Sequence, residues 1–284
     1  MTTAYLGPKG TFSEEAAIAW AGAEGDHIPM PSIPALVRAV ESRETDDAVM
    51  PIENSIEGAI STTLDLLIHE TNLNIQAEVV IPVRLCLIGL PGTSLDQIRT
   101  VTSHSNPLGQ SRQFLERNLP GVTQVAAMST AAAVQEVVDL GDPTRAAIGT
   151  RNAVEQIGGE ILVSDIQDVA TNVTRFVVVG FGEAAPTGDD KTSVAYTLPE
   201  DVPGSLYRSI RPIAEHKLQL TKLESRPSKS HLGNYVFLVD FLGHRSDPVV
   251  AEALREVEEQ CTTFKIFGSY PRFPIESLVL GGSE

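Results

Sequence analysis

The sequence is poor in cysteine, in aromatic residues and in positive charge, and each shortage excludes a class of protein. Its two cysteines, Cys86 and Cys261, lie far apart and outside any motif, so we expect reduced thiols in a cytoplasmic protein and no disulfide. The chain has 21 Lys and Arg against 37 Asp and Glu, a formal net charge of -16, and no basic block that would suit nucleic acid. No apolar run is long enough to span a membrane, and the first residues lack the pattern of a signal peptide.

Signatures of metal and phosphate sites are also missing. The sequence contains no CxxC pair, no HExxH, no GxxxxGK[ST] and no GxSxG. We therefore expect neither a metal nor a cofactor. A small anionic ligand stays possible for an acidic chain, because a few local cations in a cleft decide whether an anion binds there.

Strand-like and helix-like runs alternate up to about residue 180. Residues 3–7 and 47–53 are typical of strands, and residues 13–23 and 31–44 of helices, with Thr11 or Ser13 and then Ser32 as caps. This alternation predicts an α/β fold with parallel sheets and helices on both faces.

A stretch rich in Gly, Pro and charge, "GFGEAAPTGDDK", then predicts a linker. We place one domain at residues 1–182 and a second at 191–276. The pattern of the second is βαββαβ, the ferredoxin-like order.

Polar side chains follow two of the expected strands. Glu53, Asn54, Ser55 and Glu57 come at the end of a buried strand in "MPIENSIEGAI", and Ser103 and His104 end another in "TSHSNPLGQ". Ligands of open α/β sheets collect outside the carboxyl ends of strands. Taken singly, each segment is explained as well by a helix cap, a polar turn or a structural histidine, and the turn "GPKG" at residues 7–10 is equally ambiguous.

The segment "NVTRF", residues 172–176, adds an arginine. No Asp or Glu stands between Asn172 and Gly182, so we expect the charge of Arg175 to be uncompensated and to attract an anion. Arginine is suited to bidentate recognition of a carboxylate. Composition and pattern alone therefore indicate a small-anion site in a two-domain α/β protein.

Together, these segments resemble the prephenate dehydratase family over nearly the whole chain. The first part matches through "GPKGTFSEEAA", "PIENSIEG", "SH" followed by Leu108 and Gln110, "AAIGT" and "NVTRF". The second part matches through "GSLYRSI", "TKLESRP", Tyr235, Phe237, Asp240 and "GH" at residues 243–244.

The resemblance implies a two-lobed catalytic domain similar to periplasmic binding proteins, with the active site between the lobes, and a C-terminal ACT regulatory domain. The implied reaction is the decarboxylating dehydration of prephenate to phenylpyruvate in L-phenylalanine biosynthesis, without cofactor or metal. The implied effector is phenylalanine, and a homodimer or homotetramer is expected. Because the first strand begins close to Met1, we expect the monofunctional form, without a chorismate mutase domain.

The resemblance also implies roles for individual residues. Thr174 is expected at the leaving hydroxyl and Arg175 at the pyruvyl carboxylate, with Glu53 or His104 as the source of the proton. The remaining substrate-binding residues are expected to be Asn172, Phe176, Asn54, Ser55, Ser103, Gln110 and Thr11. The effector-binding residues are expected to be Gly204, Ser205, Leu206, Glu224, Ser225, Arg226 and Pro227.

The sequence departs from the family pattern at three places. The family's "SHPQALAQ" is "SHSNPLGQ" here, which alters residues 105–107, "GSL" replaces "GAL", and Gln219 stands where asparagine is usual. We expect the last two changes to affect the affinity or selectivity for the effector. Alternative interpretations are an arogenate dehydratase, a non-catalytic solute-binding or amino-acid sensor protein, and, for the second domain, a dimerisation module without a ligand.

Overall fold

The computed structural model describes residues 1–200, 202–228 and 235–274. The chain forms two compact units, one from Met1–Ile60 with Val79–Phe176 and the other from Ser61–Glu78 with the residues from Val177 onward. The units are therefore not consecutive stretches of chain, and the domain boundary between residues 182 and 191 stays a prediction. Residues 201, 229–234 and 275–276 of the predicted second domain lie outside the described part of the chain.

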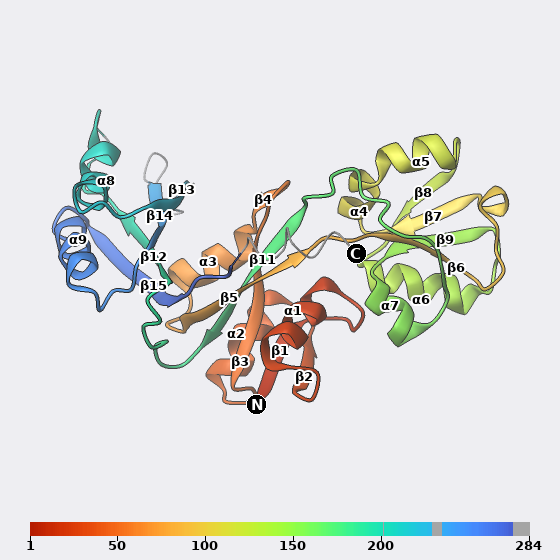
Figure 1. Ribbon diagram of the computed structural model, residues 1–284, viewed down its shortest axis with the longest axis horizontal. Coiled ribbons are helices and arrows are strands. Elements are labelled where there is room, and N and C mark those ends of the chain that lie inside the picture. The colour runs from red at the N-terminus through yellow and green to blue at the C-terminus, as the bar shows by residue number, and fades with distance from the viewer. Residues whose placement is uncertain (201, 229–234, 275–284) are drawn as a thin grey trace. The chain divides into compact units, whose positions relative to one another are not determined.

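The first sheet has the strand order β2-β1-β3-β11-β5, with β4 paired to β3 (Figure 1). Strand β1 is parallel to both β2 and β3. Its strands are β1 (Thr2–Leu6), β2 (Asp26–Met30), β3 (Asp47–Asn54), β4 (Gly58–Ala59), β5 (Asn74–Pro82) and β11 (Val173–Gly180).

Two capped helices accompany this sheet, α1 (Phe12–Ala21) and α2 (Ile33–Glu41). The Thr11 hydroxyl accepts a hydrogen bond from the amide of Glu14, and the Ser32 hydroxyl accepts one from the amide of Ala35. The predicted N-caps Thr11 and Ser32 are thus confirmed. Each cap satisfies one of the amides that the first turn of a helix leaves without an intrahelical partner.

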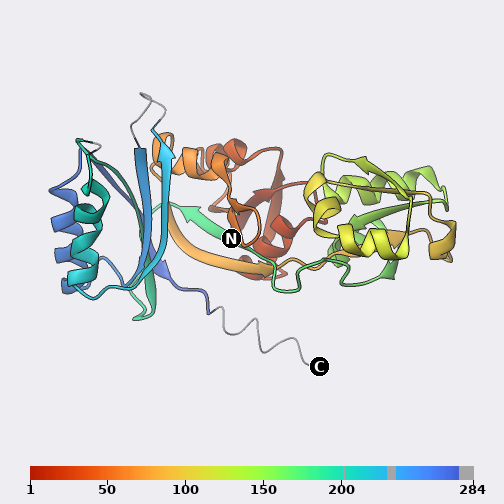
Figure 2. The ribbon, with the colours of Figure 1, turned by 90° about the horizontal axis from the view of Figure 1, so that it is seen from above.

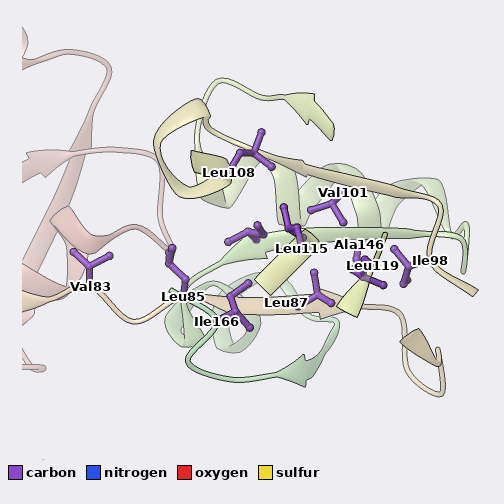
Figure 3. Packing of buried hydrophobic residues seen from close by; sticks show 11 residues of the cluster. Val83, Leu85, Leu87, Ile98, Val101, Leu108, Leu115, Leu119, Ala146 and Ile166 are labelled. Carbon is purple, nitrogen blue, oxygen red and sulfur yellow. The ribbon is translucent and has the colours of Figure 1, made fainter. Parts of the chain in front are cut away.

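The second sheet has the order β10-β6-β9-β7-β8 and carries helices on both faces (Figure 1). Side chains alternate along β6, so that Leu87 packs with Leu108 and Leu115 on one face (Figure 3), while Ile88 packs with Val134 on the other. The strands are β6 (Cys86–Gly89), β7 (Thr100–Ser103), β8 (Thr123–Ala126), β9 (Arg145–Gly149) and β10 (Glu160–Val163). The helices are α4 (Ser105–Gln110), α5 (Arg112–Asn118), α6 (Thr130–Leu140) and α7 (Arg151–Ile157), with a 3-10 turn at Leu95–Gln97.

The expectation of purely parallel sheets is wrong for this second sheet. Strand β7 is parallel to β8 and β9, but β6 is antiparallel to both β9 and β10. Within this sheet the chain passes from β6 to β7 through residues 90–99, which contain only a 3-10 turn. Parallel strands need a crossover connection, usually a helix, and this short link leaves β6 antiparallel to the direction shared by β7, β8 and β9.

The second unit contains a four-stranded sheet of order β13-β14-β12-β15, with its paired strands antiparallel. Figure 2 shows its two long helices on one face, where Val194, Tyr196 and Phe241 form a core with Ile213 and Val250. The elements follow the βαββαβ order that the sequence pattern predicted. They are β12 (Asp190–Thr197), α8 (Ser205–Glu215), β13 (Leu220–Pro227), β14 (Tyr235–Leu242), α9 (Pro248–Glu258) and β15 (Thr263–Pro271).

The opposite face of this sheet holds α3 (Ser61–His69), which belongs to the same unit. Arg226 on β13 donates to Ser61 Oγ and to Asp65 Oδ1, both at 3.2 Å. Lys265 on β15 donates to the backbone oxygens of Leu67 at 2.7 Å and Thr71 at 2.6 Å, and burial lowers the pKa of its ammonium. A basic side chain of the sheet therefore contacts each end of α3, and the cation at its C-terminus matches the negative end of the helix dipole.

Candidate functional site

Two segments about 120 residues apart meet because β3 and β11 are neighbours in the first sheet. The amide Nδ2 of Asn54 lies 2.9 Å from Asn172 Oδ1, 3.2 Å from the carbonyl oxygen of Val173 and 3.0 Å from Thr174 Oγ1. One side chain of "PIENS" thus contacts three consecutive residues of "NVTRF". The two motifs form a single polar cluster.

The hydroxyl of Thr174 is oriented by this contact. Its oxygen accepts a hydrogen bond from Asn54, so its own hydrogen is directed to some other acceptor. The side chain is half-buried, in the part of β11 that precedes the fully buried residues 176–180. The Thr174 hydroxyl therefore keeps a hydrogen that it can donate to an acceptor other than Asn54.

Asn172 is the most buried amide of the cluster, at 1% exposure. Its Oδ1 accepts from Asn54 and from the hydroxyl of Ser55 at 3.2 Å, and Ser55 Oγ in turn accepts from the backbone amide of Val173 at 3.0 Å. The Nδ2 atom of Asn172 is buried and makes no hydrogen bond with the described residues. A buried donor without an acceptor is costly, and such a group marks a place where a ligand or water can add an acceptor.

Arg175 is compensated, contrary to expectation. Its Nη1 lies 3.8 Å from Glu53 Oε2, and the two side chains are 13% and 35% exposed. The absence of nearby acidic residues along the chain was a correct observation, but the neighbouring strand β3 supplies one. A counter-ion can come from any adjacent strand, which a reading of local sequence does not see.

The predicted residues of the second sheet have different surroundings. The hydroxyl of Ser103 is fully buried and donates to the carbonyl of Ile148 at 2.7 Å, which joins β7 to β9. His104 is the N-cap of α4, and its Nδ1 accepts from the amide of Asn106 at 3.4 Å. The structural role that the sequence allowed for this histidine is thus present.

Gln110 differs from Ser103 and His104, because its side chain reaches a residue of the first sheet's hairpin. Its Nε2 donates to Glu57 Oε1 at 2.8 Å, and Glu57 also accepts from Nδ2 of Asn106. Glu57 was among the polar residues expected after this strand but was given no role, and Asn106 was not predicted as a site residue. The sequence signal for a role of Glu57 was its position as the second acidic residue of "PIENSIEG", on the other side of the turn from Glu53.

Two other predicted substrate ligands are engaged locally. Thr11 Oγ1 donates towards the carbonyls of Pro8 at 3.1 Å and Leu6 at 3.3 Å in addition to capping α1. Phe176 is 1% exposed and belongs to the core of the protein. Their roles in substrate binding stay predictions.

A second acidic group, which sequence reasoning also missed, lies at the start of α1. The carboxylate of Glu14 accepts from the hydroxyl of Tyr5 at 3.0 Å, the amide of Gly10 at 2.6 Å and Nδ2 of Asn152 at 2.8 Å. Burial raises the pKa of its neighbour Glu15 to about 7, and the negative charges of Glu14 and Glu155 add to this effect. In the described part of the chain, no three His, Cys, Asp or Glu side chains are grouped so that they could hold a metal ion. No described helix has the length and apolar character required to cross a bilayer.

The predicted effector residues fall into two groups. A pocket of about 460 Å³ at the start of α8 is lined by Gly204, Ser205 and Leu206 together with apolar side chains that include Tyr235 and Phe237. Glu224 and Arg226 do not line this pocket. Instead, Lys222 lies 3.3 Å and Arg226 3.5 Å from the Glu224 carboxylate, Arg226 also pairs with Asp65, and Ser225 and Pro227 are exposed.

The fold and the site define a mixed α/β protein in which a cluster of amides, hydroxyls and one arginine–glutamate pair can bind a small polar molecule. The sequence profile of the family described as "Prephenate dehydratase" matches residues 3–183. A prephenate dehydratase of Mycolicibacterium vanbaalenii is 39% identical to this chain, and the alignment covers 94% of this chain and 90% of the relative. The chain belongs to the prephenate dehydratase family, and it is a hydro-lyase.

Two solved structures are similar over almost the whole chain. One is the prephenate dehydratase of Arthrobacter aurescens in complex with L-Phe, with 35% identity, a TM-score of 0.89 and coverage of 96% of this chain and 90% of that one. The other is GqqA, described as a novel type of quorum quenching acylase, with 28% identity, a TM-score of 0.87 and coverage of 97% and 100%. The same fold is thus associated with two described activities.

Proposed function

We propose that this chain catalyses the decarboxylating dehydration of prephenate to phenylpyruvate, in the biosynthesis of L-phenylalanine. The observation that carries the proposal is the 3.0 Å contact between Asn54 and Thr174, which joins the two family motifs into one site. The family membership of the chain supports the same conclusion.

The difficult step of this reaction is the departure of hydroxide from the ring, since the gain of aromaticity favours the rest. A hydrogen bond or proton at the leaving oxygen is needed, and general acid assistance of this kind contributes about 10²–10⁴ in rate. Thr174 is suited to hold the leaving oxygen because its own oxygen already accepts from Asn54 and its hydrogen is left to donate. Threonine is too weak an acid to supply the proton alone, so Glu53 or His104 is proposed as the source.

The two carboxylates of prephenate should be bound with different strength. The carboxylate that leaves as carbon dioxide should not be held by a strong ion pair, because ground-state stabilisation of that charge would slow the reaction. We therefore place Arg175 at the pyruvyl carboxylate, beside Glu53. Asn172, Asn54, Ser55, Ser103 and Gln110 are proposed as neutral contacts to the substrate in a cleft between two lobes.

A direct assay tests the activity. Purified protein is mixed with prephenate, and phenylpyruvate is measured against a control without enzyme that corrects for uncatalysed aromatisation. Arogenate is assayed in parallel, with phenylalanine as the product. Turnover of prephenate well above the control supports the proposal, turnover of arogenate alone makes the chain an arogenate dehydratase, and turnover of neither favours a non-catalytic binding protein.

We also propose that the βαββαβ region is an ACT domain that binds phenylalanine and inhibits the enzyme. The pocket of about 460 Å³ beside Gly204, Ser205 and Leu206 has apolar walls suited to an aromatic side chain. The relative from Arthrobacter aurescens was solved in complex with L-Phe. Glu224 and Arg226 are proposed to bind the charged ends of the amino acid, in an assembly that is a homodimer or homotetramer.

Phenylalanine should then raise the melting temperature and lower the activity, with a coupling free energy of about 1–3 kcal/mol. D-phenylalanine serves as the matched control, and light scattering with and without the effector reports the oligomeric state. If millimolar L-phenylalanine changes neither the melting temperature nor the activity, the domain is a dimerisation module without this ligand.

The structural similarity to the acylase supports a second, weaker candidate function. Hydrolysis of acylated quorum-sensing signals by this chain would give it the activity for which that relative is described. The same preparation is incubated with such signals, and release of the free acid is measured. Acid release that survives Thr174→Ala, a substitution predicted to lower the rate of dehydration about 10²–10³-fold, would assign that activity to a different set of residues.

A further inference from the structure

The turn that begins at Asn54 and carries Glu57 contacts two parts of the candidate site, Thr174 on β11 and Gln110 on α4. The side chain of Asn54 accepts from the backbone amides of Ile56 at 2.9 Å and Glu57 at 3.1 Å, which holds the turn closed. The same amide group donates to Thr174 through its nitrogen. The position of the Glu57 backbone is therefore tied to the position of the Thr174 hydroxyl.

From this turn the carboxylate of Glu57 reaches α4 of the second sheet. It accepts from Gln110 Nε2 at 2.8 Å and from Asn106 Nδ2. Gln110 is the last residue of α4, and its backbone oxygen accepts from the amide of Asp168 at 2.6 Å, so its main chain is held independently. Glu57 therefore acts on the direction of the Gln110 side-chain amide and not on the Gln110 main chain.

An ionised carboxylate can only accept hydrogen bonds, and it is therefore suited to fixing the direction of the Gln110 side-chain amide. A side-chain amide has an oxygen end and a nitrogen end, and rotation by about 180° exchanges them. Facing Glu57, Gln110 must present its nitrogen, and that nitrogen carries a second hydrogen that can be donated to an anionic substrate. With a neutral amide at position 57, Gln110 could turn its oxygen towards an anion and repel it.

We propose that Glu57 is a positioning residue for the dehydratase reaction, which acts by fixing the amide of Gln110 with a donor directed at a carboxylate of the substrate. This inference rests on the proposed function of the chain. The two oxygens of the exposed Glu57 carboxylate accept from two side-chain amides of α4, those of Gln110 and Asn106.

The test is a double-mutant cycle in steady-state kinetics with prephenate. Glu57→Ala and Gln110→Ala should each raise KM about 10-fold and lower kcat less than about 3-fold, as expected for loss of a hydrogen bond to a charged group. The double variant should be no worse than Gln110→Ala alone, because Glu57 acts through that amide. Glu57→Gln should retain part of the affinity, and Glu57→Asp should resemble Glu57→Ala because the shorter side chain does not reach.

Glu116→Gln is the matched control, since Glu116 is an exposed glutamate of α5 that pairs only locally with Arg112 in an i,i+4 pair. It should leave KM unchanged. Additive effects of Glu57→Ala and Gln110→Ala, a KM for Glu57→Ala within about 2-fold of the wild type, or a fall in KM would each overturn the proposal. Failure of the wild-type protein to turn over prephenate would instead refute the proposed function, and the two failures are thereby distinguished. If Glu57→Ala does not fold, Glu57→Gln replaces it in the cycle, and its smaller rise in KM should disappear when Gln110 is already alanine.

Discussion

The side chains of Asn54 and Thr174 lie 3.0 Å apart, although 120 residues separate them in the chain. Asn54 also holds the turn that ends at Glu57, so one amide organises the hydroxyl, the turn and, through Glu57, the amide of Gln110. The site is therefore a connected hydrogen-bond network, in which the effect of one substitution depends on the others.

Removal of the Thr174 hydroxyl should affect turnover more than binding. We expect Thr174→Ala to lower kcat by about 10²–10³ with a KM within a few-fold of the wild type, because the hydroxyl is needed most when the leaving oxygen gains charge. Thr174→Ser should retain most of the activity. Steady-state assays of phenylpyruvate formation measure both constants.

Thr123→Ala, in the exposed strand β8, is the matched control and should behave as the wild type. Near-normal turnover by Thr174→Ala would remove Thr174 from the mechanism.

Loss of the Arg175 guanidinium should affect binding first. Arg175→Leu should raise KM for prephenate about 10- to 100-fold, since hydrogen bonds to charged groups contribute about 1.5–3 kcal/mol. Arg175→Lys should recover part of the affinity but not the bidentate geometry. Normal prephenate binding by Arg175→Leu, measured by calorimetry, would exclude Arg175 as the carboxylate ligand.

The source of the proton can be assigned by comparing Glu53→Gln with His104→Asn. The residue that supplies the proton should lose about 10²-fold or more in kcat and one limb of the pH profile, and the other should not. Glu53→Gln also removes the counter-ion of Arg175, so its KM is measured separately. An unchanged pH profile in both variants would exclude both candidates.

The contribution of Glu15 to the stability of the protein should decrease as the pH rises from about 4.5 to about 7. Burial raises the pKa of its folded form to about 7. In this window the unfolded chain loses the proton of Glu15 while the folded chain keeps it, which favours unfolding. Glu15→Gln cannot ionise, so its gain in unfolding free energy over the wild type should be roughly 2 kcal/mol larger at pH 8 than at pH 5.

Denaturant titrations at the two pH values measure this difference. Glu155→Gln is the control, because the negative charge of Glu155 raises the pKa of Glu15 much less than burial does. A gain for Glu15→Gln that does not depend on pH would contradict the assignment.

The buried ion pair of Lys191 and Glu78 should be important for stability. Lys191 Nζ lies 2.8 Å from both oxygens of the Glu78 carboxylate, and the side chains are 9% and 1% exposed. Lys191→Met should lower the unfolding free energy by about 3–5 kcal/mol, because it leaves a buried carboxylate without its cation. Replacement of both residues by apolar side chains should recover part of that loss.

The exposed pair Arg112–Glu116, with exposures of 61% and 60%, gives the contrast. Arg112→Ala should lower the free energy of unfolding far less than Lys191→Met does, as is usual for surface ion pairs. Equal losses at the two sites would show that burial does not determine the strength of these pairs.

Local signals predicted the helices better than the strands. The caps at Thr11 and Ser32 were identified correctly, because a hydroxyl placed before an apolar-periodic run acts on amides within three residues. Strand β2, of sequence "DHIPM", has no alternation and was missed. Two short helices, α4 and α5, follow each other with the chain turning between them at the buried Ser111.

The sequence by itself determined which residue types lie at strand ends and helix starts, since these depend on neighbours a few positions away. It therefore predicted the "PIENS" and "NVTRF" segments as parts of a site and the βαββαβ order of the last region. Tertiary structure alone decided that Glu53 compensates Arg175, that Asn54 holds Thr174, and that Glu57 reaches Gln110. Each of these contacts joins residues more than 50 positions apart, and strand order and helix packing, which local sequence does not specify, bring them within hydrogen-bonding distance.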